Sequence, residues 1–164
     1  MKFRVQIAAQ RGFSMLEILI ALVIIAIALL GTAGLQVYAM RVNQSGQFRT
    51  QAVFLASDIA ERMEANKVAA VAGHYVQALT SVSSVAATDC ATTACSSADL
   101  AGWDISQWGV AIAGLLPQAT WQITQTTAGN PSTYSIVINW TDRGSNKTSR
   151  SENFSYTATR TVSD

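Results

Sequence analysis

Positive charge is missing from nearly half of this 164-residue chain. No Lys or Arg occurs in residues 68–142, although the whole chain holds 11 basic and 10 acidic residues. Because phosphate binding needs clustered cations, this stretch argues against a nucleic-acid surface. The last basic residues are explained most simply as solubilising loop charges: Arg143, Lys147, Arg150 and Arg160. We therefore expect no direct binding of nucleic acid.

Residues typical of catalytic and metal sites are scarce. His74 is the only histidine, and no G-x-S-x-G motif occurs, so a histidine-based triad would depend on one residue. Asp89, Asp99 and Asp104 lack the alternate spacing of a calcium-binding EF-hand loop and are interpreted as solvated loop carboxylates. We expect no enzyme, no metal site, no cofactor and no small-molecule substrate.

Cysteine is nearly absent as well, with only Cys90 and Cys95 in the chain. Their spacing is not C-x-x-C, and the single histidine is remote in sequence, which argues against metal binding. A disulfide between them is the preferred interpretation for an exported domain. Two free thiols are the alternative, since geometry can forbid the bridge.

A long apolar run, residues 13–35, is the most prominent feature of the sequence. Between Arg11 and Arg41 the only charged side chain is Glu17. A helix of this length spans ~34 Å, enough to cross a hydrocarbon core of about 30 Å. A plain membrane anchor and a cleaved secretory signal are the simplest interpretations. Glu17 argues against both, because a carboxylate at the bilayer centre costs about 2.5–3.5 kcal/mol and does nothing for a secretory signal.

Residues 11–17, R-G-F-S-M-L-E, resemble the processing site of type IV prepilins. The resemblance implies that a prepilin peptidase removes the leader 1–12 by cutting between Gly12 and Phe13, and that the new amine of Phe13 is methylated. A glycine before the cut lets an extended backbone enter a protease site without a Cβ in the way. Glu17 lies one helical turn beyond Phe13. In this family the matching glutamate meets the amine of a neighbouring subunit, which would pair the charge in apolar surroundings.

Two later segments resemble one particular group of pilins. Residues 55–67, L-A-S-D-I-A-E-R-M-E-A-N-K, are similar to a helix of the PilV minor pilins, also called type IV pilus modification proteins. Residues 99–108, D-L-A-G-W-D-I-S-Q-W, resemble the family's Trp-containing segment. The resemblance implies a non-catalytic role in type IV pilus assembly and priming, hence in twitching motility, adhesion or DNA uptake. The implied partners are major and other minor pilins.

Two alternatives stay open. The N-terminal motif also occurs in pseudopilins of type II secretion, so a pseudopilin is the first alternative. Residues 55–67 and 99–108 favour a PilV minor pilin over a pseudopilin, because they resemble PilV. The other alternative is a membrane-anchored, exported domain that binds sugar or DNA without forming a filament. It predicts an intact N-terminus and independence from a prepilin peptidase.

The leader carries Lys2, Arg4 and Arg11 and no acidic residue. By the positive-inside rule, the N-terminus stays in the cytoplasm and the C-terminal domain is exported. We therefore expect a single-pass protein of the bacterial inner membrane with a periplasmic domain, which then moves to the pilus at the cell surface.

The apolar helix is expected to continue past Gly31 and Gly34, with a bend or local melting there, and to stop near Asn66. An amphipathic pattern follows in its second half, and spacings of three and four from Phe48 onward put its residues on one stripe: Val42, Phe48, Ala52, Leu55, Ile59 and Met63. Residues 68–80 are expected to be helical, 81–97 to form a loop, and 103–116 to form a short helix that ends at Pro117.

Alternating apolar residues predict three strands, at 119–124, 134–140 and 154–159, in an antiparallel meander with one buried face. The tryptophans are interpreted as core residues rather than a sugar-stacking surface: Trp103, Trp108, Trp121 and Trp140. The expected fold is α+β and pilin-like. A long N-terminal helix, with a membrane-spanning half and an amphipathic half, packs on a C-terminal antiparallel sheet. The expected divisions are a leader (1–12), a transmembrane helix (13–35), an amphipathic helix half (36–66), a variable loop with short helices (67–118) and the sheet (119–164), with 36–164 as one globular domain.

Overall fold

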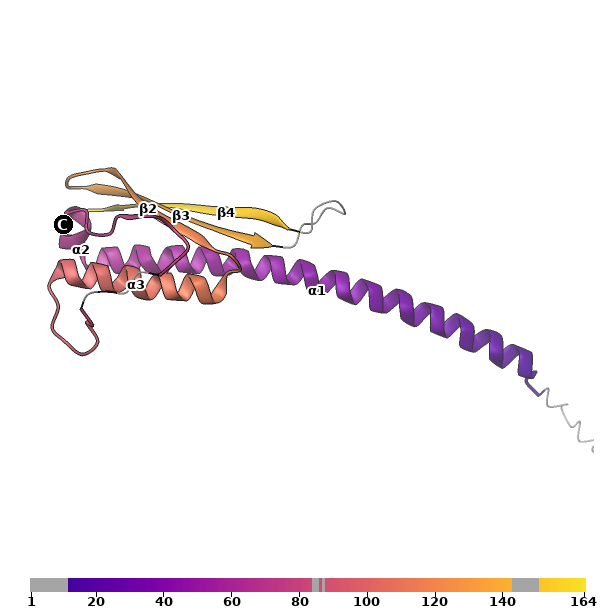
Figure 1. The fold of residues 1–164 in the computed structure, drawn as a ribbon. Helices are drawn as coiled ribbons and strands as arrows, with labels where there is room; N and C mark the ends of the chain where they lie inside the picture. Colours follow the sequence, from indigo (N-terminus) through magenta and orange to yellow (C-terminus); the bar gives the residue numbers. More distant parts are fainter. Residues whose placement is uncertain (1–11, 84–85, 87, 143–150) are drawn as a thin grey trace, which may run out of the picture. The chain divides into compact units, whose positions relative to one another are not determined.

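In a computed structural model, the described residues are 12–83, 86, 88–142 and 151–164 (Figure 1). They divide into two compact units, with the boundary between Val42 and Asn43. Helix α1, Met15–Ala65, is continuous over 51 residues and passes through Gly31 and Gly34 without interruption. The long N-terminal helix expected from the sequence is therefore confirmed.

In the second unit, one face of α1 is buried, and this face follows the predicted stripe. It consists of Ala52, Leu55, Ala56, Ile59 and Met63. Phe48 packs against the same core while remaining partly exposed. Val42 is an exception, because its side chain is 53% exposed and lies in the first unit. Six residues separate Val42 from Phe48, which is not a helical spacing of three or four, so Val42 does not continue the stripe.

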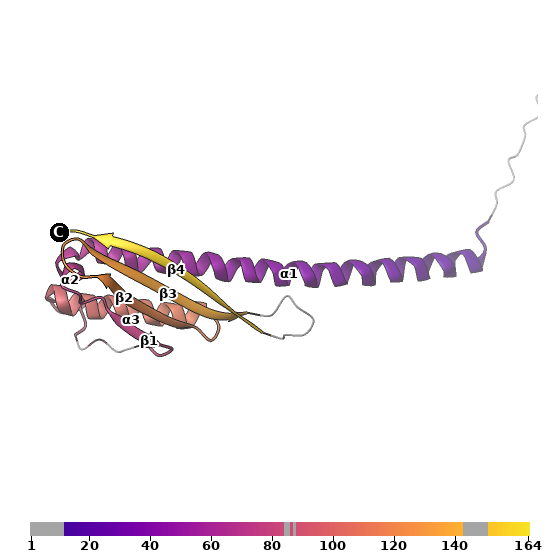
Figure 2. The same ribbon diagram turned by 90° about the horizontal axis from the view of Figure 1, so that it is seen from above.

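A four-stranded antiparallel sheet, in the order β1-β2-β3-β4, contains the three strands expected from the sequence. These are β2 (Thr120–Thr127), β3 (Ser132–Asp142) and β4 (Glu152–Val162). In both views the sheet covers helix α3 and the part of α1 that lies in the second unit (Figure 1 and Figure 2). The fold is the predicted α+β arrangement of a long helix packed on an antiparallel sheet.

The fourth strand, β1 (Gln77–Thr80), replaces the second part of the helix expected at residues 68–80. Helix α2 covers only Lys67–Val71, and the chain then reverses at Gly73, whose φ is +86°. Glycine adopts this left-handed conformation at little cost, so it ends the helix. Gln77 then pairs with Ile123, at the edge of the sheet. The helix expected at these last residues was wrong, because an Ala- and Val-rich sequence is compatible with either a helix or a strand. The strand forms because β2 offers an edge with which it can pair.

Helix α3, Ser97–Leu115, begins six residues before the expected start at Trp103. The side chain of Ser96 accepts a hydrogen bond from the backbone N–H of Asp99 at 3.2 Å and donates one to its carboxylate at 2.6 Å. This reciprocal pair is a capping arrangement that satisfies a free N–H at the start of the helix. The loop that composition predicted for residues 81–97 therefore ends at Ser96, and the helix begins at Ser97.

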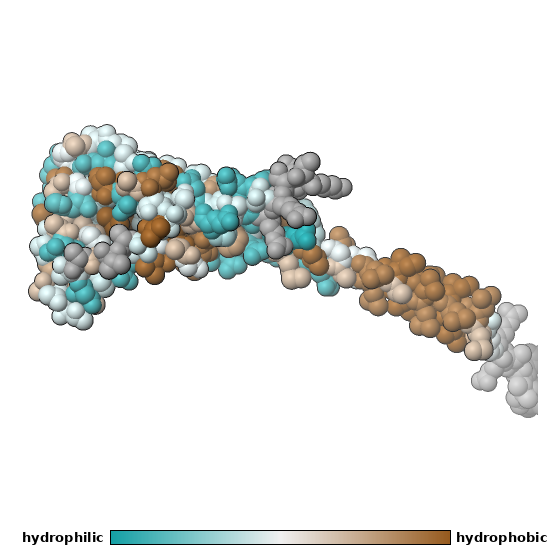
Figure 3. Space-filling view, viewed as in Figure 1, coloured by the Kyte–Doolittle hydropathy of each residue, from teal (hydrophilic) through white to brown (hydrophobic). Residues whose placement is uncertain are grey.

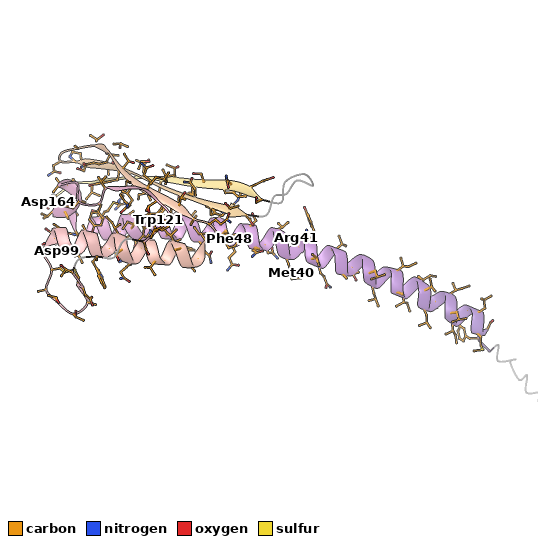
Figure 4. The ribbon with its side chains drawn as sticks, in the orientation of Figure 1. Met40, Arg41, Phe48, Asp99, Trp121 and Asp164 are labelled. Carbon is orange, nitrogen blue, oxygen red and sulfur yellow. A yellow bond between two sulfur atoms is a disulfide. The ribbon has the colours of Figure 1, made fainter. Side chains whose placement is uncertain are left out.

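The core lies between the sheet and the two helices, and aromatic side chains fill much of it. Trp121 is 1% exposed and lies between the sheet and the helices (Figure 4). The buried indole N–H of Trp108, on α3, donates to the carbonyl of Leu55, on α1, at 2.7 Å. Trp140 is also buried, and Trp103 is half-buried. Trp108, Trp121 and Trp140 are therefore core residues, as the sequence indicated, whereas Trp103 is not part of the core cluster.

Candidate functional site

The segment at the start of α1 is the candidate site for processing. Gly12, Phe13 and Ser14 precede the helix, and Phe13 is 78% exposed. The hydroxyl of Ser14 accepts from the N–H of Leu16 at 3.3 Å, and its carbonyl accepts from the N–H of Glu17 at 3.0 Å. Because Ser14 caps the helix at this point, the Gly12–Phe13 bond is outside the helix and open to a protease. Lys2, Arg4 and Arg11 lie outside the described residues.

Glu17 lies in the first turn of α1 and is exposed. The free N–H groups of a helix start carry partial positive charge, so a carboxylate is favourable there. Within the part of the chain that the structure describes, no side chain forms a hydrogen bond or an ion pair with the Glu17 carboxylate. This carboxylate is therefore open to a partner outside the chain.

From Ile18 to Leu35, α1 presents mainly apolar side chains on every side. Every described residue up to Val42 is exposed, including Ile24 at 61% and Leu30 at 75%. On the face shown in Figure 3, this part of α1 is mostly hydrophobic. By length and composition, α1 contains one stretch that could cross a membrane. Thr32 is compatible with such surroundings, because its hydroxyl donates to the carbonyl of Leu29 at 2.9 Å, within the helix.

A polar cluster ties the second unit's part of α1 to α3. The Nε of Arg62 donates to both carboxylate oxygens of Asp58 at 3.1 Å, and its Nη1 donates to Asp104 at 3.1 Å. The hydroxyl of Tyr75, which is fully buried, donates to the other oxygen of Asp104 at 2.6 Å. Asp104 therefore joins α1, α3 and the chain before β1 through both of its oxygens.

The electrostatics of this cluster favour the charged Arg62 and the neutral Tyr75. Burial raises the pKa of Tyr75, and its hydrogen bond to Asp104 raises it further. Burial by itself would lower the pKa of Arg62, but the hydrogen bonds to Asp58 and Asp104 outweigh it and raise that pKa. Tyr75 therefore stays neutral and Arg62 stays charged through the physiological pH range.

A second set of ion pairs ties β4 to α1. Arg160 approaches the Glu64 carboxylate at 3.0 Å, and Lys67 approaches its other oxygen at 3.2 Å. The hydrogen bonds from Lys67 and then Arg160 lower the pKa of Glu64. Arg160 is therefore not a solubilising loop charge, as the sequence suggested, but a strand residue with a helix partner. The other three basic residues of that group lie outside the described residues.

The three aspartates considered as a calcium site have three different roles in the structure. Asp89 accepts from the N–H of Ala91 within its own loop, and the Asp99 carboxylate accepts from the hydroxyl of Ser96, the residue that caps α3. Asp104 is only 7% exposed and is therefore not a solvated loop carboxylate. The described residues contain no group of three His, Cys, Asp or Glu that could hold a metal ion. His74 is exposed.

Cys90 and Cys95 form a disulfide, with a Cα–Cα distance of 5.5 Å. The bond closes a short loop before α3 and agrees with the pairing preferred from the sequence. The roles of Asp104 and Tyr75 were missed, because the sequence does not reveal that residues 29 positions apart share a hydrogen bond. The only local signal was a carboxylate on the apolar side of a helical segment.

Two family models match the chain. The prokaryotic N-terminal methylation motif matches residues 7–33, and the family described as type IV pilin Tt1218 matches residues 34–106. No curated protein and no solved structure gives a significant match. The two matches support a pilin role, processing by a prepilin peptidase, and association with pilins and a membrane. Pilins are typically structural proteins.

Proposed function

We propose that this chain is a minor pilin of the PilV type, because it matches a type IV pilin family and the N-terminal methylation motif. It takes part in priming and assembling a type IV pilus, and so in twitching motility, adhesion or DNA uptake. The observation that carries this proposal is the start of α1. There, an exposed Gly12–Phe13 bond is followed one turn later by Glu17 and an exposed apolar helix.

The proposed sequence of events begins in the inner membrane. The N-terminus lies in the cytoplasm, where the peptidase cuts after Gly12 and the amine of Phe13 is methylated. The globular domain lies in the periplasm. The apolar part of α1 first contacts lipid and then the equivalent helices of major and other minor pilins. Since lipid and filament core are both apolar, the exposed side chains keep similar surroundings during this transfer.

Glu17 has a different role from its apolar neighbours. In the filament its carboxylate pairs with the N-terminal amine of an adjacent pilin. An unpaired charge is costly in apolar surroundings, so this pair favours only the register in which both charges meet. The mechanism is therefore assembly by subunit contacts, without a catalytic step.

A pseudopilin of type II secretion is the second candidate, since it would have the same N-terminal segment. The two candidates differ in the gene neighbourhood, which would contain other minor pilin genes or secretion genes. A membrane-anchored binding domain is the third candidate, and it requires no cleavage at Gly12.

We predict that Glu17→Ala is cleaved normally but enters pili at least about tenfold less than the unchanged protein, because the buried amine of the partner loses its counter-charge. The measurement is an immunoblot of sheared pili beside the membrane fraction. Glu61→Gln is the matched control, because it removes an exposed carboxylate from the second unit's part of the same helix. Normal amounts of Glu17→Ala in sheared pili would contradict the proposed pairing.

Mass spectrometry of the intact protein and its N-terminal peptide, from the native membrane, tests the class of protein. The proposal requires a chain that begins at N-methylated Phe13, with Cys90 and Cys95 together lighter by two hydrogens. A chain that begins at Met1 would instead favour a plain membrane anchor. A start near Leu35 would indicate a secretory signal and exclude the filament role.

A further inference from the structure

Strand β4 is an open edge of the sheet (Figure 2). It pairs with β3 at successive positions from Glu152 to Val162, without a bulge. Among the described residues, no backbone hydrogen bond outside the regular helices and strands involves β4. The side of β4 that faces away from β3 therefore carries backbone N–H and C=O groups with which no described segment pairs.

The other edge strand, β1, is protected in ways that β4 is not. β1 has only four residues, and its pairing with β2 is irregular between Gln77 and Thr80. Short length and irregular pairing are two features by which proteins keep edge strands from binding other chains. β4 has 11 residues, no proline, and charged side chains only at Glu152 and Arg160, near its two ends. β4 is therefore the edge that is better suited to bind another strand.

One face of α1 runs along β4. The guanidinium of Arg49 lies over the ring of Phe154, 5.1 Å from its centre, and Arg160 approaches the Glu64 carboxylate at 3.0 Å. The helix from Arg49 to Glu64 is ~22 Å long, and the strand from Phe154 to Arg160 is ~20 Å long. Because the two lengths match and both ends are in contact, α1 and β4 lie alongside each other over this distance.

The hydrophobic core is incompletely covered along this edge. The helix-facing residues of β3 are buried, whereas three of those on β4 are only half-buried: Phe154, Tyr156 and Ala158. On α1, Ala60 is also partly buried against the core, and Val53 is 40% exposed. Spacings of four and seven place Val53 and Ala60 on the same helix face as Arg49. An added strand with apolar residues on its inner side would cover this part of the core.

Arg49 adds a requirement for negative charge at one end of this edge. It is exposed and forms no ion pair, although every acidic residue of the chain lies in the described part. A carboxylate opposite Phe154 on an added strand would lie on the same face as Arg49. A second copy of this chain does not supply one, because β1 has no acidic residue. An antiparallel β4 with its Glu152 opposite Phe154 would pair residues 152–154 alone.

We propose that the open edge of β4 binds an extended segment of another protein, which adds a fifth strand to the sheet. The residues of this segment alternate, with apolar side chains toward α1 and small polar side chains on the outer face. A carboxylate near one end of the segment pairs with Arg49. Backbone hydrogen bonds supply affinity and the alternate side chains supply specificity, as in other domains that bind peptides by strand addition. This interaction goes beyond assembly through the apolar part of α1 and does not rest on it.

The test is a titration of the full-length chain, in detergent, with a peptide of sequence T-V-T-V-T-E-T that is blocked at both ends. Bound antiparallel to β4, this peptide places its valines opposite Ala158 and Tyr156 and its glutamate opposite Phe154. The readout is the NMR shift and the hydrogen-exchange rate of the backbone amides. We expect saturable shifts and slower exchange along β4, between Phe154 and Arg160, and neither effect along β1.

Two control peptides test the pattern and the charge. The peptide V-V-T-T-T-E-T has the same composition without the alternation, and it should not bind. The peptide T-V-T-V-T-Q-T should bind about threefold more weakly than the glutamate peptide, as expected for the loss of one exposed ion pair. Arg49→Gln should weaken binding of the glutamate peptide by the same factor and leave binding of the glutamine peptide unchanged. Arg41→Gln is the matched control and should bind like the unchanged protein, since Arg41 is an exposed arginine of α1 in the first unit.

The proposal is overturned if the glutamate peptide does not bind at up to about 1 mM, the range of weak complexes. It is also overturned if the shifts lie along β1, if the peptide without alternation binds equally well, or if the glutamine peptide binds as tightly as the glutamate peptide. Slower exchange along β4 at high protein concentration without any peptide would show that a second copy occupies the edge, which likewise overturns it. None of these results bears on the Glu17 assembly test, which concerns the first unit.

Discussion

At the scale of single residues, charged side chains join segments that lie far apart in the sequence. Asp104 uses one carboxylate oxygen for Arg62 on α1 and the other for the Tyr75 hydroxyl. Breaking one of these contacts leaves a buried polar group without its partner, which costs more than the contact itself contributes. The cluster should therefore be sensitive to small changes that leave its packing intact.

We predict that Tyr75→Phe lowers the free energy of unfolding by about 1–3 kcal/mol, because the Asp104 carboxylate loses its hydroxyl donor while the ring stays in place. Urea unfolding followed by tryptophan fluorescence measures this, since all four tryptophans lie in the second unit. Tyr156→Phe is the matched control, because Tyr156 is half-buried and its hydroxyl has no partner among the described residues. An effect of similar size in both variants would contradict the role of Asp104.

Glu64 supplies a residue-scale prediction about pH. Its pKa in the fold lies below the ordinary value of 4.5, so it stabilises the fold above that pH. This stabilisation is lost as the pH falls through the lowered pKa. We expect the urea midpoint to fall less in Glu64→Gln than in the unchanged protein between about pH 6 and about pH 3. Equal decreases would show that the contacts with Lys67 and Arg160 contribute nothing.

At the scale of elements, α3 packs tightly against Trp121 of β2 at Gly109. A Cβ on Gly109 would lie 3.0 Å from Cζ2 of Trp121 and 3.3 Å from Cβ of Ser83. Trp121 is held in the core and cannot move aside freely. Gly102, on the same helix, is exposed, and a Cβ added there would meet no atom within 4 Å. Substitutions at these two glycines therefore distinguish the effect of packing from the effect of helix propensity.

We predict that Gly109→Ala destabilises the domain by about 1–3 kcal/mol, since the added methyl group overpacks the contact between α3 and β2. Gly102→Ala should instead stabilise it by about 0.5–1 kcal/mol, because alanine is the better helix former and has open space there. Thermal unfolding by circular dichroism measures both variants. If both changes stabilised the domain, α3 would not pack against Trp121 as described.

At the scale of the whole molecule, the buried core belongs entirely to one unit. The core residues begin at Ala52, whereas every described residue up to Val42 is exposed. Apolar burial is the main favourable contribution to folding, so the second unit should not need the first in order to fold. The exposed apolar side chains of the first unit should instead require lipid, detergent or neighbouring helices.

We predict that a fragment of residues 43–164 is soluble without detergent and unfolds in one cooperative transition. The full chain should need detergent to remain in solution at the same concentration. Size-exclusion chromatography and a thermal melt measure both properties. A fragment that aggregates, or that melts without a cooperative transition, would show that the apolar helix contributes to the folding of the domain.

The sequence alone was enough to predict the features that depend on local patterns. An uninterrupted apolar run predicted the first part of α1, because a helix forms its backbone hydrogen bonds within the segment and therefore suits apolar surroundings. Period-two alternation predicted β2, β3 and β4, because strand residues point alternately to the two faces. The Cys90–Cys95 pair was the only disulfide that the composition allowed. These inferences needed no knowledge of which segments meet.

Only the tertiary structure decided which distant residues meet. The short β1 exists because β2 offers it an edge, and Asp104 is buried because Arg62 and Tyr75 lie against it. Each of these features depends on contacts across many positions of the chain. Local propensity carries no information about such contacts, because they form only when the sheet and the helices pack together.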